Sequence, residues 1–120
     1  MKVLLVEDDK FLSSILKTKL EQAGLDVTLA LDGEQALEVL KTFNPDLILL
    51  DLILPKKSGF EVLEITSQDP QLEQIPVIIL SNLGQEKDIE RTKQLGAIEY
   101  YIKAKTSIDF LIERIKDILK

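Results

Sequence analysis

Short runs of apolar residues alternate along the chain with longer segments in which apolar residues recur every three or four positions. Three of the runs are wholly apolar: Val3–Val6, the run between Asp46 and Asp51, and Val77–Leu80. Such runs are typical of strands buried on both faces of a parallel sheet. Two further runs, Asp26–Ala30 and Ile98–Ile102, mix polar and apolar residues, as edge strands do. The pattern predicts five strands, of which three are central.

The longer segments have the spacing of helices that bury one face. Asp32 with Gln35, and Ser58 with Glu61, match the capping-box pattern of helix starts. The helix after Ser58 is expected to end by Asp69–Pro70. The expected core-facing residues are Phe11, Leu12, Ile15, Leu16, Leu20 and Ala23 in the first helix, Ala36, Leu37, Val39, Leu40 and Phe43 in the second, Phe60, Leu63 and Ile65 in the third, Ile89 and Leu95 in the fourth, and Ile108, Leu111, Ile112, Ile115, Ile118 and Leu119 in the fifth.

The order strand, helix, repeated five times, determines the fold class. A helix between two neighbouring strands implies a right-handed crossover and a parallel sheet covered by helices on both faces. Placing the mixed runs at the edges gives the strand order 2-1-3-4-5, in which ligands bind outside the carboxyl ends of the strands. Residues 1–120 are therefore predicted to form one α/β domain, a doubly wound (βα)5 sandwich of the flavodoxin-like type.

Composition excludes several classes of function. Lys and Arg number 15 and Asp and Glu 21, a net charge of −6, which argues against a general nucleic-acid binder. The chain has no Cys and no His, so a bound metal must be held by oxygen, which favours a hard cation such as Mg²⁺. No signal peptide opens the chain and no apolar run reaches the length of a membrane span. We therefore expect a cytoplasmic protein with no direct contact to membrane or nucleic acid.

Polar residues follow the strands at the edge where ligands are expected. Glu7 and Asp8 follow the first strand, and Asp51, Ser81 and Lys103 follow the third, fourth and fifth. Three carboxylates in one crevice repel one another, and a divalent cation relieves this repulsion. Mg²⁺ takes one or two carboxylates, keeps several waters and adds a phosphoryl oxygen readily. The constellation predicts that Asp51 acts as an oxygen nucleophile that forms an aspartyl phosphate, while Lys103 and Ser81 contact the phosphoryl oxygens.

These residues and their spacing resemble the receiver domain of two-component response regulators over essentially the whole chain. Each motif is weak alone, and the combination is specific. The matching residues are the acidic pair Glu7 and Asp8, the phosphoacceptor Asp51, Pro55 and Gly59 after it, the switch residue Ser81, the switch aromatic Tyr100 and the lysine Lys103.

The resemblance implies a mechanism. A histidine kinase or phosphotransfer protein would donate a phosphoryl group to Asp51 with the help of Mg²⁺. The metal would be held by Glu7, Asp8, Asp51 and the backbone carbonyl of Ile53. The domain would catalyse only its own phosphorylation and dephosphorylation.

The resemblance also implies an output. Ser81 would move toward the phosphoryl group and Tyr100 would swing inward behind it. The surface of the fourth helix, fifth strand and fifth helix would then change its affinity for a downstream protein target or an output domain, and a homodimer on phosphorylation is one such outcome. No DNA-binding segment follows residue 120 in this sequence, so a free-standing regulator and the receiver portion of a longer protein both fit.

Two departures from the family pattern bear on the site. Ala104 stands where the family usually has a proline with a cis bond, and a cis bond before alanine costs about 2.5–4 kcal/mol. We therefore expect a differently built loop after Lys103. The positions two past Asp51 and two past Ser81 are Ile53 and Leu83, where polar side chains in the family help to position the hydrolytic water. We expect slow self-dephosphorylation as a result.

Other interpretations remain for single residues and for the whole. Asp9 fits a charge at a helix start better than a metal ligand. A phosphatase of the haloacid dehalogenase type also uses a strand-end Asp with Mg²⁺, but it needs a second Asp where this chain has Ile53. A flavodoxin-like nucleotide or flavin binder needs a phosphate loop after the first strand, where Glu7 and Asp8 would repel phosphate.

Overall fold

A computed structural model describes residues 1–120. The ten helices and strands alternate, as the hydrophobic pattern predicts, and a short 3₁₀ turn at Lys103–Lys105 follows the last strand. The elements are β1 (Lys2–Val6), α1 (Lys10–Gln22), β2 (Asp26–Ala30), α2 (Gly33–Leu40), β3 (Leu47–Leu50), α3 (Gly59–Gln68), β4 (Val77–Ser81), α4 (Glu86–Gln94), β5 (Glu99–Ile102) and α5 (Ile108–Ile118).

The five strands form one parallel sheet in the order β2-β1-β3-β4-β5, which confirms the predicted topology. β1, β3 and β4 are central and β2 and β5 are the edges. All residues of β3 and β4 are buried, whereas every residue of β5 is half-exposed. The difference explains why the wholly apolar runs are central strands: both of their faces lie against helices.

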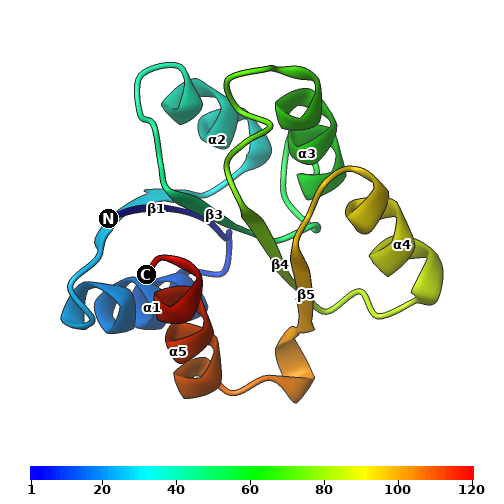
Figure 1. Ribbon diagram of the computed structural model, residues 1–120. Helices are drawn as coiled ribbons and strands as arrows, with labels where there is room; N and C mark the ends of the chain where they lie inside the picture. The colour runs from blue at the N-terminus through cyan, green and yellow to red at the C-terminus, as the bar shows by residue number, and fades with distance from the viewer.

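Helices cover both faces of the sheet (Figure 1). α1 and α5 lie against one face, and α2, α3 and α4 lie against the other (Figure 1). Side chains that alternate along each strand supply the two resulting cores. In β3, Leu47 and Leu49 join the core with α1 and α5, and Ile48 and Leu50 join the core with α2 and α3. Each core contains 13 buried apolar residues, and β1, β3 and β4 contribute to both.

Side-chain caps start the helices where the sequence indicates them. Ser58 and Glu61 form a capping box at α3. Asp32 accepts a hydrogen bond from the Gln35 amide at α2. Asp9 caps α1 in the same way, which confirms its interpretation as a helix-start residue. These caps satisfy amides that have no partner within the helix.

Two predicted core positions are wrong, and one buried position was not predicted. Phe11 and Ile65 lie on the surface, with 78% and 43% of their area exposed. Thr92, which was not among the predicted core residues, is the buried residue of α4. Its hydroxyl donates to the Ile89 carbonyl of the preceding turn, so a threonine can be buried there without an unpaired polar group. α4 is therefore held by less apolar burial than the other helices.

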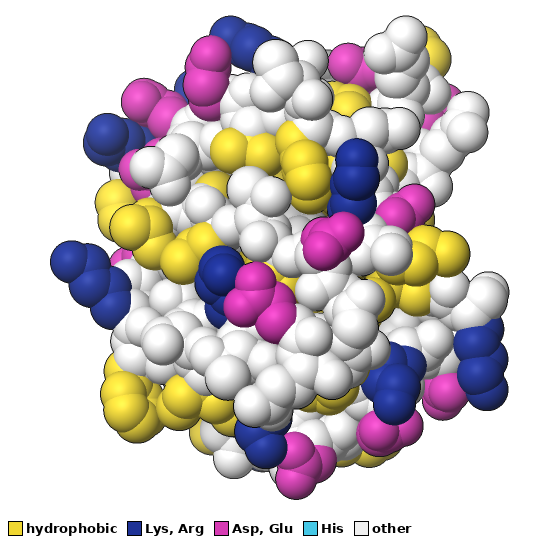
Figure 2. All heavy atoms as spheres, turned by 90° about the vertical axis from the view of Figure 1, so that its left-hand side faces the viewer, with side chains coloured by type: hydrophobic (Ala, Val, Ile, Leu, Met, Phe, Trp, Pro, Cys, Tyr) yellow, Lys and Arg dark blue, Asp and Glu magenta, His cyan; other side chains and the backbone are white.

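The surface carries charges of both signs. Basic and acidic side chains are interspersed on the face shown in Figure 2, with apolar side chains scattered between them. That face has no extended basic patch of the kind that binds a nucleic-acid backbone. None of the helices combines the length and the hydropathy needed to span a lipid bilayer.

Candidate functional site

The register of the sheet brings the predicted acidic residues together. Val6 in β1 pairs with Leu50 in β3, so Glu7 and Asp51 are the next residues of two adjacent strands. The Asp51 amide donates to the Val6 carbonyl at 3.0 Å, and the Glu7 amide donates to the Ala30 carbonyl at 3.0 Å. Main-chain bonds of the sheet thus fix both carboxylates at its carboxyl edge.

Lys103 bridges the two buried carboxylates. Its Nζ lies 2.7 Å from Glu7 Oε1 and 2.8 Å from Asp51 Oδ2. The side chains of Glu7 and Asp51 are only 2% and 5% exposed. The remaining Asp51 oxygen, Oδ1, accepts from the Ile53 amide at 3.3 Å. A cavity of about 360 Å³ opens beside this ion pair, and its lining residues are Glu7, Asp8, Asp9, Asp51, Ile53, Asn82 and Lys103.

Burial and charge shift the pKa values of two of these groups in the same direction. Burial raises the pKa of Glu7, and the nearby charge of Asp51 adds to the rise, while the hydrogen bond with Lys103 opposes it. For Lys103, burial acts to lower the pKa, but its hydrogen bonds with Asp51 and Glu7 outweigh this and raise the pKa. Lys103 is therefore charged at neutral pH and balances part of the acidic cluster.

The acidic side chains fit a hard divalent cation. Glu7, Asp8 and Asp51 each offer a carboxylate oxygen, and these three oxygens lie within 4.8 Å of one another. Asp8 is exposed to solvent while the other two are buried, so the site combines two fixed ligands with one on the open side. Oxygen-only ligands on an open cavity suit Mg²⁺, which keeps several waters. The cluster could thus bind a metal ion.

Ser81 is the last residue of β4, at the carboxyl edge of the sheet. Ser81 is fully buried at the end of β4, and its Oγ accepts a hydrogen bond from the Leu83 amide at 3.3 Å. Its neighbour Asn82 lines the cavity instead. A contact of the Ser81 hydroxyl with a phosphoryl group on Asp51 therefore stays a prediction. Sequence reasoning missed Asn82 because a Ser-Asn pair after a strand also fits an ordinary turn.

Tyr100 is not among the residues that line the cavity, and it is linked to Ser81 through Leu83. Its hydroxyl donates to the carbonyl of Leu83, the residue whose amide bonds to Ser81. Burial raises the pKa of Tyr100, and the charges of Asp88 and Asp51 add to the rise. The phenol therefore stays a hydrogen-bond donor at neutral pH.

The loop after Lys103 is built without a cis peptide bond, as expected with alanine at position 104. The chain has no cis peptide bond, and Lys103–Lys105 form a single 3₁₀ turn. The Thr106 hydroxyl closes this segment by donating to the Ile102 carbonyl at 2.9 Å. With this turn, Lys103 still reaches both carboxylates.

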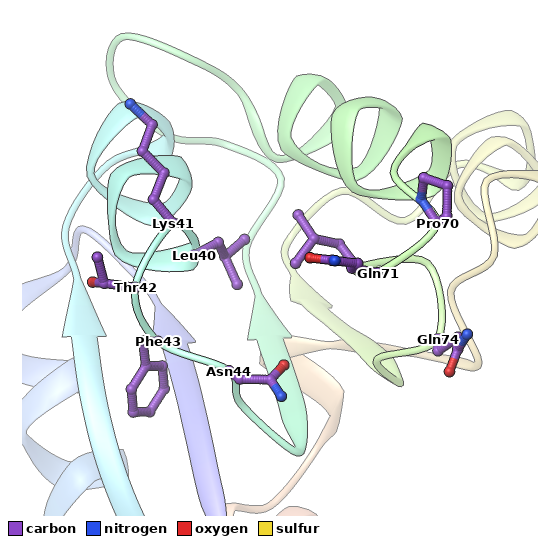
Figure 3. A pocket seen from close by; sticks show the side chains of 9 residues that line it. Leu40, Lys41, Thr42, Phe43, Asn44, Pro70, Gln71 and Gln74 are labelled. Atoms are coloured by element: carbon purple, nitrogen blue, oxygen red, sulfur yellow. The ribbon is translucent and has the colours of Figure 1, made fainter.

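A larger cavity, of about 570 Å³, lies away from the acidic cluster (Figure 3). It is formed by the segments that lead into β3 and β4, at the opposite ends of these strands. Its side chains are amides, aliphatic groups, one aromatic ring, one hydroxyl and one lysine, with no carboxylate: Leu40, Lys41, Thr42, Phe43, Asn44, Pro70, Gln71, Leu72 and Gln74. Because it offers neither an acidic cluster nor an activated nucleophile, the candidate chemistry stays at the carboxyl edge.

Comparison with known proteins identifies the family. The family model described as the response regulator receiver domain matches residues 3–116, and the chain belongs to this family of two-component signalling domains. Transcriptional regulatory protein CpxR of Escherichia coli K12 is 43% identical over 119 residues, which cover 99% of this chain and 49% of CpxR. The chain thus spans about half the length of that relative.

Other relatives have nearly the length of this chain. The polar-differentiation response regulator DivK of Brucella ovis is 35% identical over 98% of this chain and 94% of DivK. The receiver domain of Francisella response regulator 1452 superimposes with a TM-score of 0.89 at 37% identity, covering 98% of this chain and 94% of that one. The BeF3-activated receiver domain of Klebsiella pneumoniae RstA gives a TM-score of 0.88 at 29% identity, covering 100% and 99%.

Proposed function

We propose that this receiver accepts a phosphoryl group on Asp51 from a histidine kinase or a phosphotransfer protein. The observation that carries the proposal is the Lys103 ammonium, which bridges Asp51 and Glu7 beside the exposed Asp8. A buried carboxylate beside a fixed cation and two further acids is a favourable arrangement for a nucleophile that works with Mg²⁺.

Each side chain has a distinct role in the transfer. An Asp51 oxygen attacks phosphorus, and the bond from phosphorus to the partner's histidine nitrogen breaks. Glu7 and Asp8, with Asp51 and the Ile53 carbonyl, would hold Mg²⁺, which would supply positive charge for the phosphoryl oxygens. Lys103 neutralises another of these oxygens.

The output of the proposed reaction is a change in surface affinity. Ser81 donates its hydroxyl hydrogen to the phosphoryl group, and Tyr100 packs behind it. The surface of α4, β5 and α5 then binds a downstream protein or an output domain, or a second copy of this chain. Size-exclusion chromatography that shows only monomer, with and without a phosphoryl analogue, would rule out the dimer.

Thermal unfolding tests the proposed chemistry. We expect Mg²⁺ at about 100 times its dissociation constant to stabilise the wild type by about 2.7 kcal/mol relative to EDTA. Beryllofluoride, an analogue of the phosphoryl group, should add a second gain. Asp51→Asn should lose the second gain because it lacks the carboxylate that the analogue binds.

The outcomes separate two classes of protein. Two successive gains in the wild type, with the second absent in Asp51→Asn, support phosphoacceptor function. If neither Mg²⁺ nor beryllofluoride shifts the transition, the proposal is wrong, and the chain is a receiver that works through protein contacts alone.

A further inference from the structure

The first residue of α2, Gly33, touches the loop that joins β3 to α3. A Cβ added to Gly33 would overlap the Lys57 carbonyl oxygen and lie 2.6 Å from the Lys57 Cβ. The Gly33 amide also faces the Pro55 carbonyl, at 3.5 Å. The start of α2 and the β3–α3 loop are therefore packed backbone against backbone, with no room for a side chain between them.

This contact supports a loop in an uncommon conformation. Lys56 has a φ of +66°, a value that few residues other than glycine adopt without cost. Its Nζ lies 3.9 Å from Asp32 Oδ2, next to the α2 start. An unfavourable backbone conformation persists only where its surroundings hold it. The surroundings here are Asp32 and Gly33 on one side and the rest of the loop on the other.

The same loop carries the Ile53 carbonyl, a proposed metal ligand. The Gly59 amide closes the loop at its base by donating to the Leu52 carbonyl at 2.9 Å. A Cβ at Gly59 would overlap the Asp51 carbonyl oxygen and lie 2.7 Å from the Leu52 Cα, so the two ends of the loop are packed backbone against backbone at its base. A shift imposed at Lys57 must then be taken up within residues 53–58.

The loop, and not the helix, would yield to a side chain at Gly33. Ala36 and Leu40 anchor α2 in the core. Ile53 and Lys56, in contrast, are exposed loop residues. Moving α2 would expose several packed apolar side chains, whereas in the loop only the partly buried Leu54 packs against the same core, so moving the loop costs less.

We propose that Gly33 is a positioning residue for the metal site: by leaving no gap at Lys57, it fixes the loop that presents the Ile53 carbonyl. This inference rests on the proposed function, because it assumes that the carbonyl ligates Mg²⁺. Gly33 contacts neither the metal nor the carboxylates, and it acts only through the loop.

Metal selectivity gives the sharpest test. Mg²⁺ demands near-ideal octahedral geometry, whereas Ca²⁺ tolerates longer and irregular ligand arrangements. Gly33→Ala should raise the Mg²⁺ dissociation constant about tenfold, the lower end of the effect of residues that orient metal ligands. The Ca²⁺ dissociation constant should change less. Both constants can be measured from the midpoint of thermal unfolding against metal concentration, and from the shift of the Ile53 amide in NMR spectra.

Gly24→Ala is the matched control. Gly24 has a φ of +88° and no atom within 4 Å of an added Cβ, so the substitution strains the backbone far from the site without moving the loop. It should lower stability in EDTA and leave the ratio of the Mg²⁺ and Ca²⁺ constants unchanged. If Gly33→Ala does not fold, Lys57→Gly provides the test, because it frees the same loop without an overlap and should change the ratio in the same direction.

The outcomes distinguish the two proposals. If the wild type binds no Mg²⁺, the proposed function fails, and the inference fails with it. If the wild type binds Mg²⁺ and the folded Gly33→Ala variant, or Lys57→Gly in its place, keeps the wild-type ratio of the Mg²⁺ and Ca²⁺ dissociation constants, only the positioning role is overturned. A raised ratio in that variant, together with an unchanged ratio in Gly24→Ala, supports the role.

Discussion

Lys103 is the only cation among the residues that line the acidic cavity, which makes Lys103→Met an informative perturbation. Methionine keeps an unbranched side chain of similar length and removes the charge. The carboxylates of Glu7 and Asp51, whose side chains are 2% and 5% exposed, then remain without this counter-ion. Each must protonate or stay charged and poorly solvated, and both outcomes oppose folding.

The expected cost follows from the burial of the bridge. Removing one partner of a buried ion pair typically costs about 3–5 kcal/mol. The Lys103 side chain is 16% exposed and borders an open cavity, so water compensates part of the loss and we expect about 3 kcal/mol. With an unfolding entropy of about 2.1 cal/mol/K per residue, a chain of 120 residues should unfold about 12 °C lower.

Thermal and urea unfolding in EDTA at pH 7 measure this loss. Lys17→Met is the control, because Lys17 pairs with Glu21 at 2.8 Å on the surface, where such a pair is worth about 0.3–0.5 kcal/mol. The loss in Lys103→Met should shrink as the pH falls, because protonation removes the uncompensated charges. A Lys103 variant as stable as the Lys17 variant at pH 7 would refute the reasoning.

Three further measurements test other parts of the structure. Ile53→Asn should shorten the aspartyl-phosphate lifetime by placing a polar group at the cavity, and a wild-type lifetime of seconds would contradict the expected slow hydrolysis. Arg91→Met should lower the free energy of unfolding in urea by about 1 kcal/mol, because the Arg91 guanidinium lies 4.2 Å from the centre of the Phe60 ring and connects α4 to α3. A loss below about 0.3 kcal/mol would show that this contact does not stabilise the fold. Hydrogen bonding by Arg114 lowers the pKa of Glu99, so Glu99 contributes stability above its unfolded pKa and loses it as the pH falls through the lowered folded pKa. The difference in urea midpoint between wild type and Glu99→Gln should be present at pH 7 and decrease once the pH falls below the ordinary glutamate pKa of about 4.3, and a difference that is constant with pH would contradict this.

The strand order could be predicted from the sequence because burial on two faces leaves a direct pattern. β3 and β4 have no polar residue before their last position, whereas β5 contains Glu99 and half-exposed tyrosines. The helix faces were less predictable. Phe11 and Ile65 have the spacing of core residues but lie at the margins of their stripes, and hydrophobicity alone cannot define how wide the buried stripe is.

The charged part of the site could be predicted for a related reason. In a parallel sheet the residues after adjacent strands must meet, so topology brings Glu7 and Asp51 together, and the long Lys103 side chain reaches both of them from the end of β5. Topology does not specify side-chain rotamers or the course of loops. For that reason the orientation of Ser81 could not be predicted, nor could the packing of Gly33 on Lys57, which depends on the three-dimensional course of two loops.

The orientations of Ser81 and Tyr100 give the expected switch a physical basis. Both side chains bond to the same residue, since Leu83 donates its amide to Ser81 and accepts the Tyr100 hydroxyl at its carbonyl. In its bond to Leu83 the Ser81 hydroxyl is the acceptor, so its hydrogen remains available for a phosphoryl oxygen on Asp51. If Ser81 turns toward that oxygen, the bond to the Leu83 amide must stretch or carry Leu83 with it, and the partner of Tyr100 then moves. The charge balance favours such a turn. Three carboxylates and one ammonium sum to −2, and one divalent cation would bring the sum to zero. A phosphoryl group on Asp51 would make the site negative again, so that a further hydrogen-bond donor would be stabilising.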